Sequence, residues 1–256
     1  MEVYLNAIFA MYKLANKFRW TEVWPHPTST FALAGRGVWI RVRKERRAMR
    51  TLHVVYALYY TIITMVSRSP FYQYSADIYL GQQVIGGLSI EAIPTTTSLN
   101  TSIEAIDYIS TTNTTTSDST SYSSGLGRTI TLPDMNITYN FLAGRINSRD
   151  LYTAVLSGLA DAAKEGMDTV CGELHAYSQS GNLIFWIDGE DQAGQPFTYK
   201  GATALLRAIV VDMTLEQRRF APITFTVSNG TNGLAAGFIS KWPLQGNGTA
   251  SVAAAR

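Results

Sequence analysis

Carboxylates, the side chains best suited to acid–base chemistry, gather in one stretch of this 256-residue chain. Asp188, Glu190 and Asp191 follow a predicted strand, and Glu173 lies in the strand before it. A glycosidase needs two carboxylates that converge on one bond, and a calcium loop needs oxygen ligands at fixed spacing around a glycine turn. The stretch has neither spacing, so we interpret it as a solvated turn. The alternative is an extracellular hydrolase that uses Glu173 with Asp188 or Glu190.

The other reactive side chains do not form a site. Cys171 is the single cysteine, which excludes an intramolecular disulfide and a multi-thiolate metal centre. His175 lies on the same predicted strand, about 13 Å farther along it, which is too far for a thiolate–imidazole pair. We therefore expect a buried structural cysteine, no metal and no cofactor, and we favour a protein that is not an enzyme.

Three aromatic residues could serve in binding. Trp242, Tyr177 and Tyr199 could stack on sugar rings in a cell-wall binding role. Packing at the rim of a sheet explains each of them equally well. Carbohydrate binding is therefore a secondary hypothesis.

A hydrophobic run and its charged flank predict a topology. Residues 52–66 carry no formal charge apart from a possible proton on His53, and residues 51–67 reach the roughly 17 residues at the lower limit of a membrane-spanning helix. Ten basic and three acidic residues precede residue 51, a net charge of +7, whereas the rest of the chain carries −5. This asymmetry predicts a single-pass protein with a cytoplasmic N-terminus. The competing interpretation is a buried core helix.

Glycosylation motifs agree with export of the C-terminal part. All five N-x-S/T acceptors follow the hydrophobic run, at Asn100, Asn113, Asn136, Asn229 and Asn247. We therefore expect an extracellular or cell-membrane location. A chain begun at Met49 would instead read as a signal peptide, which would make residues 1–48 an extension of the natural protein. For the chain as given, an uncleaved signal-anchor is favoured.

These observations give a domain layout. We expect a basic cytoplasmic segment (1–50), a signal-anchor or signal peptide (51–67), an extended segment (68–94), a Ser/Thr-rich linker (95–135), a folded domain (136–242) and a flexible tail (243–256). Residues 95–124 contain 18 Ser or Thr in 30 positions, a composition that cannot bury enough surface to offset its ordering entropy. That part is predicted to be a disordered stalk.

The folded domain repeats one plan, a helix followed by two strands. Asn147 and Thr198 are predicted to cap the two helices, and strand pairs follow at 169–187 and 223–240. This predicts an α+β domain in which two tandem α-β-β units place two helices on one face of a four-stranded, mainly antiparallel sheet. Residues 183–187 are apolar without alternation, so we expect that strand to be covered on both faces, by residues 71–93 or by another subunit.

The same region resembles a group of uncharacterised fungal secreted or membrane-anchored proteins with a tandem helix-hairpin C-terminal domain. The resemblance rests on the stretches NSRDLYTAVLSGLADAAKEG, TYKGATALLRAIVVDM and APITFTVSNGTNGLAAGFISK. It implies a signal-like start and brings no catalytic residues. The Arg-rich N-terminus departs from the group, which favours Met49 as the original start.

The sequence thus predicts a non-enzymatic cell-surface or secreted glycoprotein that acts as a binding or display module for an unknown ligand, and the resemblance implies that it is fungal. Its expected partners are the membrane, through residues 51–67 if these are uncleaved, and a cell-wall component or another protein. A homo-oligomer is an open alternative. Nucleic acid is not expected, because the basic stretch 41–50 lacks interleaved aromatic residues and is better explained by contact with anionic lipid.

Overall fold

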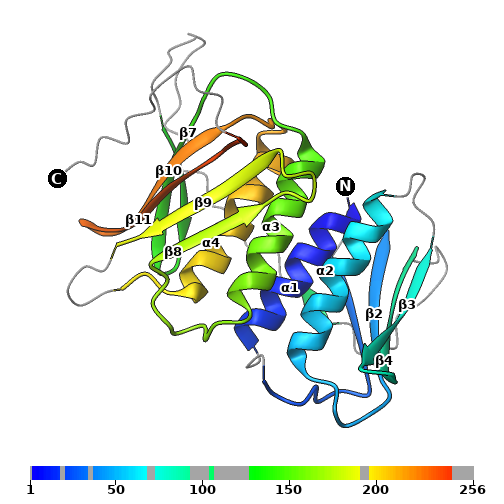
Figure 1. The fold of residues 1–256 in the computed structure, drawn as a ribbon. Helices are drawn as coiled ribbons and strands as arrows, with labels where there is room; N and C mark the ends of the chain where they lie inside the picture. Colours follow the sequence, from blue (N-terminus) through cyan, green and yellow to red (C-terminus); the bar gives the residue numbers. More distant parts are fainter. Residues whose placement is uncertain are drawn as a thin grey trace.

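Two β-sheets enclose two layers of helices in the structure, a computed structural model (Figure 1). It describes residues 2–17, 21–33, 37–67, 73–92, 104–106, 127–190 and 196–243. The helices of the two halves of the chain pack against each other in the middle, since α1 contacts α3 and α4, and α2 contacts α3. One continuous core therefore contains buried residues from both halves.

The first half of the chain forms a five-stranded sheet and two helices. Its elements are α1 (Glu2–Lys17), β1 (Thr28–Leu33), β2 (Val38–Lys44), α2 (Thr51–Ser67), β3 (Tyr74–Leu80), β4 (Gln83–Ala92) and β5 (Glu104–Ile106). The strand order is β3-β4-β2-β1-β5, antiparallel throughout except for the parallel pair of β1 and β5. The described residues of segments 1–50, 51–67 and 68–94, to which the sequence assigned separate roles, thus lie together in this half.

The second half forms a six-stranded antiparallel sheet and two helices. Its elements are β6 (Arg128–Leu132), β7 (Met135–Phe141), α3 (Ser148–Ala162), β8 (Glu173–Tyr177), β9 (Leu183–Gly189), α4 (Tyr199–Val211), the π-helical turn η1 (Asp212–Glu216), β10 (Ile223–Asn229) and β11 (Asn232–Lys241). The strand order is β6-β7-β10-β11-β9-β8. Helices α3 and α4 lie on the same face of this sheet (Figure 1).

The α+β class, the antiparallel pairing and the two helix caps are as predicted. The side chains of Asn147 and Thr198 accept hydrogen bonds from the backbone N–H groups of Arg149 and Gly201. The prediction of four strands is wrong, because β6 and β7 extend the sheet beyond β10, with Ile137 of β7 buried. Strand β6 begins within the range assigned to the linker.

The helix–strand–strand plan occurs four times rather than twice. The order α1-β1-β2-α2-β3-β4 in the first half is the same as α3-β8-β9-α4-β10-β11 in the second. The strand order of the sheets matches too, because β3-β4-β2-β1 corresponds to β10-β11-β9-β8. The structure therefore extends the predicted duplication to the whole chain.

The hydrophobic run forms α2, which lies inside the fold. Its buried residues Val54, Val55, Leu58, Ile62 and Met65 recur at helical spacing, and α2 packs against α1, α3 and β3. This is the arrangement that the core-helix interpretation describes. Among the described residues, every helix is too short or too polar to cross a bilayer.

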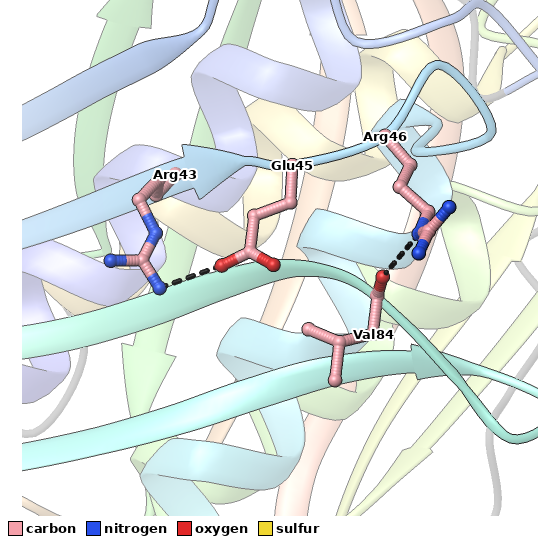
Figure 2. Close-up of polar contacts among 4 residues, drawn as sticks. All are labelled: Arg43, Glu45, Arg46 and Val84. Atoms are coloured by element: carbon pink, nitrogen blue, oxygen red, sulfur yellow. Dashed lines mark hydrogen bonds and ion pairs between the residues drawn. The ribbon is translucent and has the colours of Figure 1, made fainter.

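The basic stretch 41–50 begins within β2, and its residues just after β2 are held onto the β3–β4 hairpin (Figure 2). Arg43 Nη2 lies 2.7 Å from Glu45 Oε1, and Arg46 Nε donates to the Val84 carbonyl at 3.1 Å. The backbone N–H groups of Glu45 and Arg46 both donate to the Ile85 carbonyl. These contacts fix the path of the chain from β2 towards α2. Contact of the stretch with anionic lipid stays a prediction.

The Ser/Thr-rich stretch lies mostly outside the described residues. Its described part is β5, which pairs with β1, and residues from 127 onward, which lead into β6. The tail after residue 243 also lies outside the described residues. Residues 104–106 of the predicted stalk thus form a strand of the first sheet, whereas the rest of the predicted stalk and the predicted flexible tail lie outside the described residues.

Candidate ligand-binding surface

The outer face of the six-stranded sheet, turned away from the helices, carries a row of aromatic side chains. Burial alternates along β8, with Leu174 and Ala176 buried and Glu173, His175 and Tyr177 exposed. Because successive side chains of a strand point to opposite faces, the exposed set lies on the outer face. The strand register continues the row, since Trp186 of β9 pairs with His175 and Phe238 of β11 pairs with Trp186.

Ring contacts join these residues into one group, the aromatic strip, which consists of His175, Tyr177, Trp186, Phe238 and Trp242. The ring centroids are 5.0 Å apart for Trp186 and Phe238, 6.3 Å for His175 and Trp186, 6.4 Å for His175 and Tyr177, and 5.9 Å for Tyr177 and Trp242. Tyr177 and Trp242 each keep 39% of their surface exposed. The strip therefore offers aromatic surface to solvent while its members support one another.

The strip also accounts for the apolar run in β9. Ile184, on the outer face, is buried and pairs with Tyr177 on one side and Ser240 on the other. Of the two predicted covers for β9, residues 71–93 are excluded, because the described part of that segment forms β3 and β4 in the other sheet. Cover by another subunit stays a prediction.

A hollow of about 570 Å³ adjoins the strip at Trp242. It is enclosed by the start of α3, the turn between β8 and β9, and the end of β11. Its polar lining consists of Arg145, Asn147, Asp150, Asn182 and Lys241. The hollow thus places amide, carboxylate and cationic groups next to an exposed indole ring.

Hydrogen bonds hold the walls of this hollow in place. Asp150 Oδ1 accepts from the Ser180 hydroxyl at 2.8 Å, and the Ser180 hydroxyl accepts from the Asn182 backbone N–H at 3.2 Å. The Trp242 backbone N–H donates to the Asn182 carbonyl at 2.8 Å. Helix α3, the β8–β9 turn and β11 are therefore connected, which preorganises the polar lining around Trp242.

The sequence-predicted carboxylates lie on the open outer face. Glu173 and Asp188 are direct cross-strand partners, so their Cβ atoms are about 4.5–5.5 Å apart. Glu190 is exposed just after β9. None of the three lines the hollow beside Trp242 or the cavity that contains Arg207. The structure brings Glu173 and Asp188 together but does not enclose them.

Hydrogen bonds give Glu173 a structural role. Its Oε1 accepts from Trp186 Nε1 and from His175 Nε2, both at 2.8 Å. These two bonds lower the pKa of Glu173 below its ordinary value, because they favour the charged carboxylate. A glycosidase acid needs a raised pKa and a desolvated position. The geometry therefore supports Glu173 as an anchor for the aromatic strip and does not support the hydrolase alternative.

Cys171 lies in an unreactive setting. The side chain is buried, and burial raises the pKa of its thiol to about 11. His175 points to the outer face of the sheet, so the two residues do not form a pair. Among the described residues, no group of three His, Cys, Asp or Glu side chains is placed to hold a metal ion.

Two of the five predicted glycosylation sites lie within the described residues. Asn136 lies on β7, and exposed Asn229 ends β10. Asn100, Asn113 and Asn247 fall outside the described residues. Use of any of these sites stays a prediction.

The aromatic residues singled out from the sequence include part of this surface. Tyr177 and Trp242 come together as proposed for sugar stacking, whereas Tyr199 is half-buried at the start of α4. Trp186 and Phe238 were missed as surface residues. Trp186 could have been placed through the predicted hairpin of β8 and β9, whereas Phe238 joins it only through the long-range pairing of β11 with β9. The polar lining could not be identified, because residues 145–150, 182 and 241 meet only through the fold.

Comparisons with known proteins add little. Neither protein-family models nor curated proteins match the chain, so the resemblance to a fungal group stays a prediction. Among solved structures, the tandem DUF26 ectodomain of a cysteine-rich receptor-like protein from Arabidopsis thaliana is similar at 10% identity with a TM-score of 0.27, covering 92% of this chain and 88% of that one. A likeness at this TM-score carries no argument about fold or function.

Proposed function

We propose that this chain is a non-enzymatic binding module that holds a carbohydrate against Tyr177 and Trp242 and in the hollow beside them. The observation that carries the proposal is the exposed Tyr177–Trp242 pair, 5.9 Å between ring centroids, at the edge of a hollow lined by amide, carboxylate and cationic side chains. Sugar rings present an apolar C–H face that stacks on aromatic rings and a rim of hydroxyls that bond to such polar groups. The site therefore offers both kinds of contact that a sugar requires.

The proposal also places the module outside the cell, as a secreted or cell-surface glycoprotein. The support is the one-sided distribution of the five acceptor motifs, two of which lie in the described second half. An extracellular location would bring the site into contact with polysaccharides of a cell wall or with glycans of neighbouring proteins.

Affinity electrophoresis tests the binding proposal. The full chain is run in native gels that contain soluble β-1,3-glucan, mannan or xylan, and is mixed in parallel with insoluble chitin. We expect retardation or retention by at least one of these glycans, and loss of it in Trp242→Ala and Tyr177→Ala. Tyr79→Ala is the matched control, because Tyr79 is an exposed tyrosine in the other sheet.

Two outcomes would refute the proposal. One is the absence of binding to all four glycans by a folded protein. The other is equal binding by the wild type and Trp242→Ala while Tyr79→Ala binds less, because that result would place the glycan on the first half. Release of reducing sugar by the wild type, abolished in Glu173→Gln, would instead restore the hydrolase alternative.

A further inference from the structure

A separate cavity of about 490 Å³ lies between the two halves of the chain. Helix α1 contributes Phe9 and Tyr12, α4 contributes one wall, and the β6–β7 hairpin contributes another through Ile130 and Leu132. Its volume lies within the roughly 300–1,000 Å³ of small-molecule sites, which are mostly apolar with a few placed polar groups. This cavity shares no lining residue with the hollow beside Trp242.

Arg207 is the buried charge of this cavity. It lies on α4 with 7% of its surface exposed, and its guanidinium carbon is 4.4 Å from the centroid of the Phe9 ring and 4.6 Å from that of Tyr12. The two rings cover faces of the guanidinium, as cation–π contacts do. The five N–H donors of a guanidinium point outward in its plane, so ring stacking does not occupy them, and the Tyr12 hydroxyl is a hydrogen-bond partner of the group.

Arg207 has no carboxylate partner within the part of the chain that the structure describes. Among the described residues, none lies within ion-pair distance of Arg207, and the Tyr12 hydroxyl is the hydrogen-bonding group beside it. Burial lowers the pKa of Arg207, with a smaller opposing effect from Tyr12. A buried cation is stabilised by an anion or by several hydrogen-bond acceptors, so a buried guanidinium in the wall of a cavity is a favourable position for an anionic group of a ligand.

The other charged side chains in the described part of the lining are exposed. Water and salt therefore screen Asp134, Asp168 and Lys200. Arg207 differs from them because it is buried. The cavity therefore suits an apolar molecule with a single negative charge.

We propose that this cavity binds an amphipathic monocarboxylate, with its head group paired to Arg207 and its apolar part against Ile130, Leu132 and Phe197. A carboxylate and a guanidinium form two parallel hydrogen bonds, which suits an arginine whose ring faces are already covered. A dianionic phosphate would bring one negative charge more than Arg207 neutralises. Phe9 and Tyr12, which stack on Arg207, come from the first half, so both halves of the chain contribute to the site.

Isothermal titration calorimetry on the full chain tests this site with three probes of equal chain length. Laurate carries the carboxylate, 1-dodecanol lacks the charge, and dodecyl phosphate carries a second one. We expect laurate to bind at least tenfold more tightly than dodecanol and more tightly than dodecyl phosphate. This comparison uses the wild-type protein and so does not depend on whether a variant folds.

Substitutions then locate the site. Arg207→Gln should reduce laurate affinity at least tenfold and leave dodecanol nearly unchanged. Arg219→Gln is the matched control, because Arg219 also lies over an aromatic ring, Phe141 at 4.3 Å, but does not line the cavity. Ala204→Phe should block both probes by filling the space. Equal affinity for laurate and dodecanol, tighter binding of dodecyl phosphate, or unchanged laurate binding by a folded Arg207→Gln protein would overturn the proposal.

Discussion

Replacement of Leu58 by alanine tests whether α2 belongs to the folded core. Leu58 is 0% exposed and lies in the middle of α2, the helix that packs against α1, α3 and β3. Removing a buried leucine side chain down to alanine costs about 2–5 kcal/mol, from lost transfer free energy and the cavity left behind. We expect the free energy of unfolding of the full chain to fall by about 3 kcal/mol.

The assay is urea unfolding followed by tryptophan fluorescence. With a slope of about 3 kcal/mol per molar urea, the expected loss moves the midpoint down by about 1 M. Leu80→Ala is the matched control, because it makes the same chemical change at a leucine that is 49% exposed. We expect that control to stay within about 0.5 kcal/mol of the wild type.

This prediction is refuted if Leu58→Ala and Leu80→Ala lower the free energy of unfolding by the same small amount. If residues 51–67 sat in a bilayer rather than in the core, Leu58 would face lipid, and its replacement would leave the unfolding of the soluble part unchanged. A large effect of Leu58→Ala with a small effect of Leu80→Ala places α2 in the core.

Three further predictions follow from the same structure. A chain begun at Met49 lacks α1, β1 and β2, so it exposes the apolar surfaces of α3 and α4 that α1 covers. We expect this shortened chain to aggregate. A soluble shortened chain with native circular dichroism would contradict a core shared by the two halves. Burial raises the pKa of Tyr4 to about 12, above an unfolded value of about 10, so the contribution of the neutral phenol to stability is complete below pH 10 and is lost as the pH rises through 12. In alkaline denaturation, the free energy of unfolding of Tyr4→Phe should therefore fall less steeply with pH than that of the wild type. Identical curves would show that Tyr4 does not contribute to alkaline denaturation. When the protein is expressed in a fungal host, endoglycosidase treatment should lower its apparent mass. Asn136→Gln and Asn229→Gln should each remove part of that mass shift. An unglycosylated protein in the cytosol would refute export.

The second half could be predicted well because its local signals agree with one another. Asn147 and Thr198 are good helix caps, the helices have an apolar face, and Ile223, Phe225 and Val227 alternate with polar residues. Strands β6 and β7 were missed, since they follow a Ser/Thr-rich stretch and their place in the sheet depends on pairing with β10. Register between distant segments is a property of the fold and is not written in local sequence.

Local signals in the first half are ambiguous between a membrane span and a core helix. Residues 52–66 are apolar on nearly all sides, which suits a membrane span and also suits a helix packed between two other helices and a strand. Flanking arginines tipped the interpretation towards the membrane, although Arg43 and Arg46 bind within their own sheet. A third helix–hairpin unit at residues 2–44 would have been the deciding signal, but its sequence lacks the clear caps of the later units.

The two outer sheet surfaces face opposite directions, because both helix layers lie between them (Figure 1). On β2, the counterpart of β9, Arg41 covers Trp39 at 5.6 Å from its ring, and Trp39 is buried. On β9, Trp186 belongs to a strip that stays open to solvent. The tryptophan of β2 is thus covered by a cation of its own strand, whereas the tryptophan at the corresponding strand of the second half belongs to an open aromatic strip. Because the two surfaces lie on different sheets and face opposite ways, a ligand on one of them does not obstruct the other.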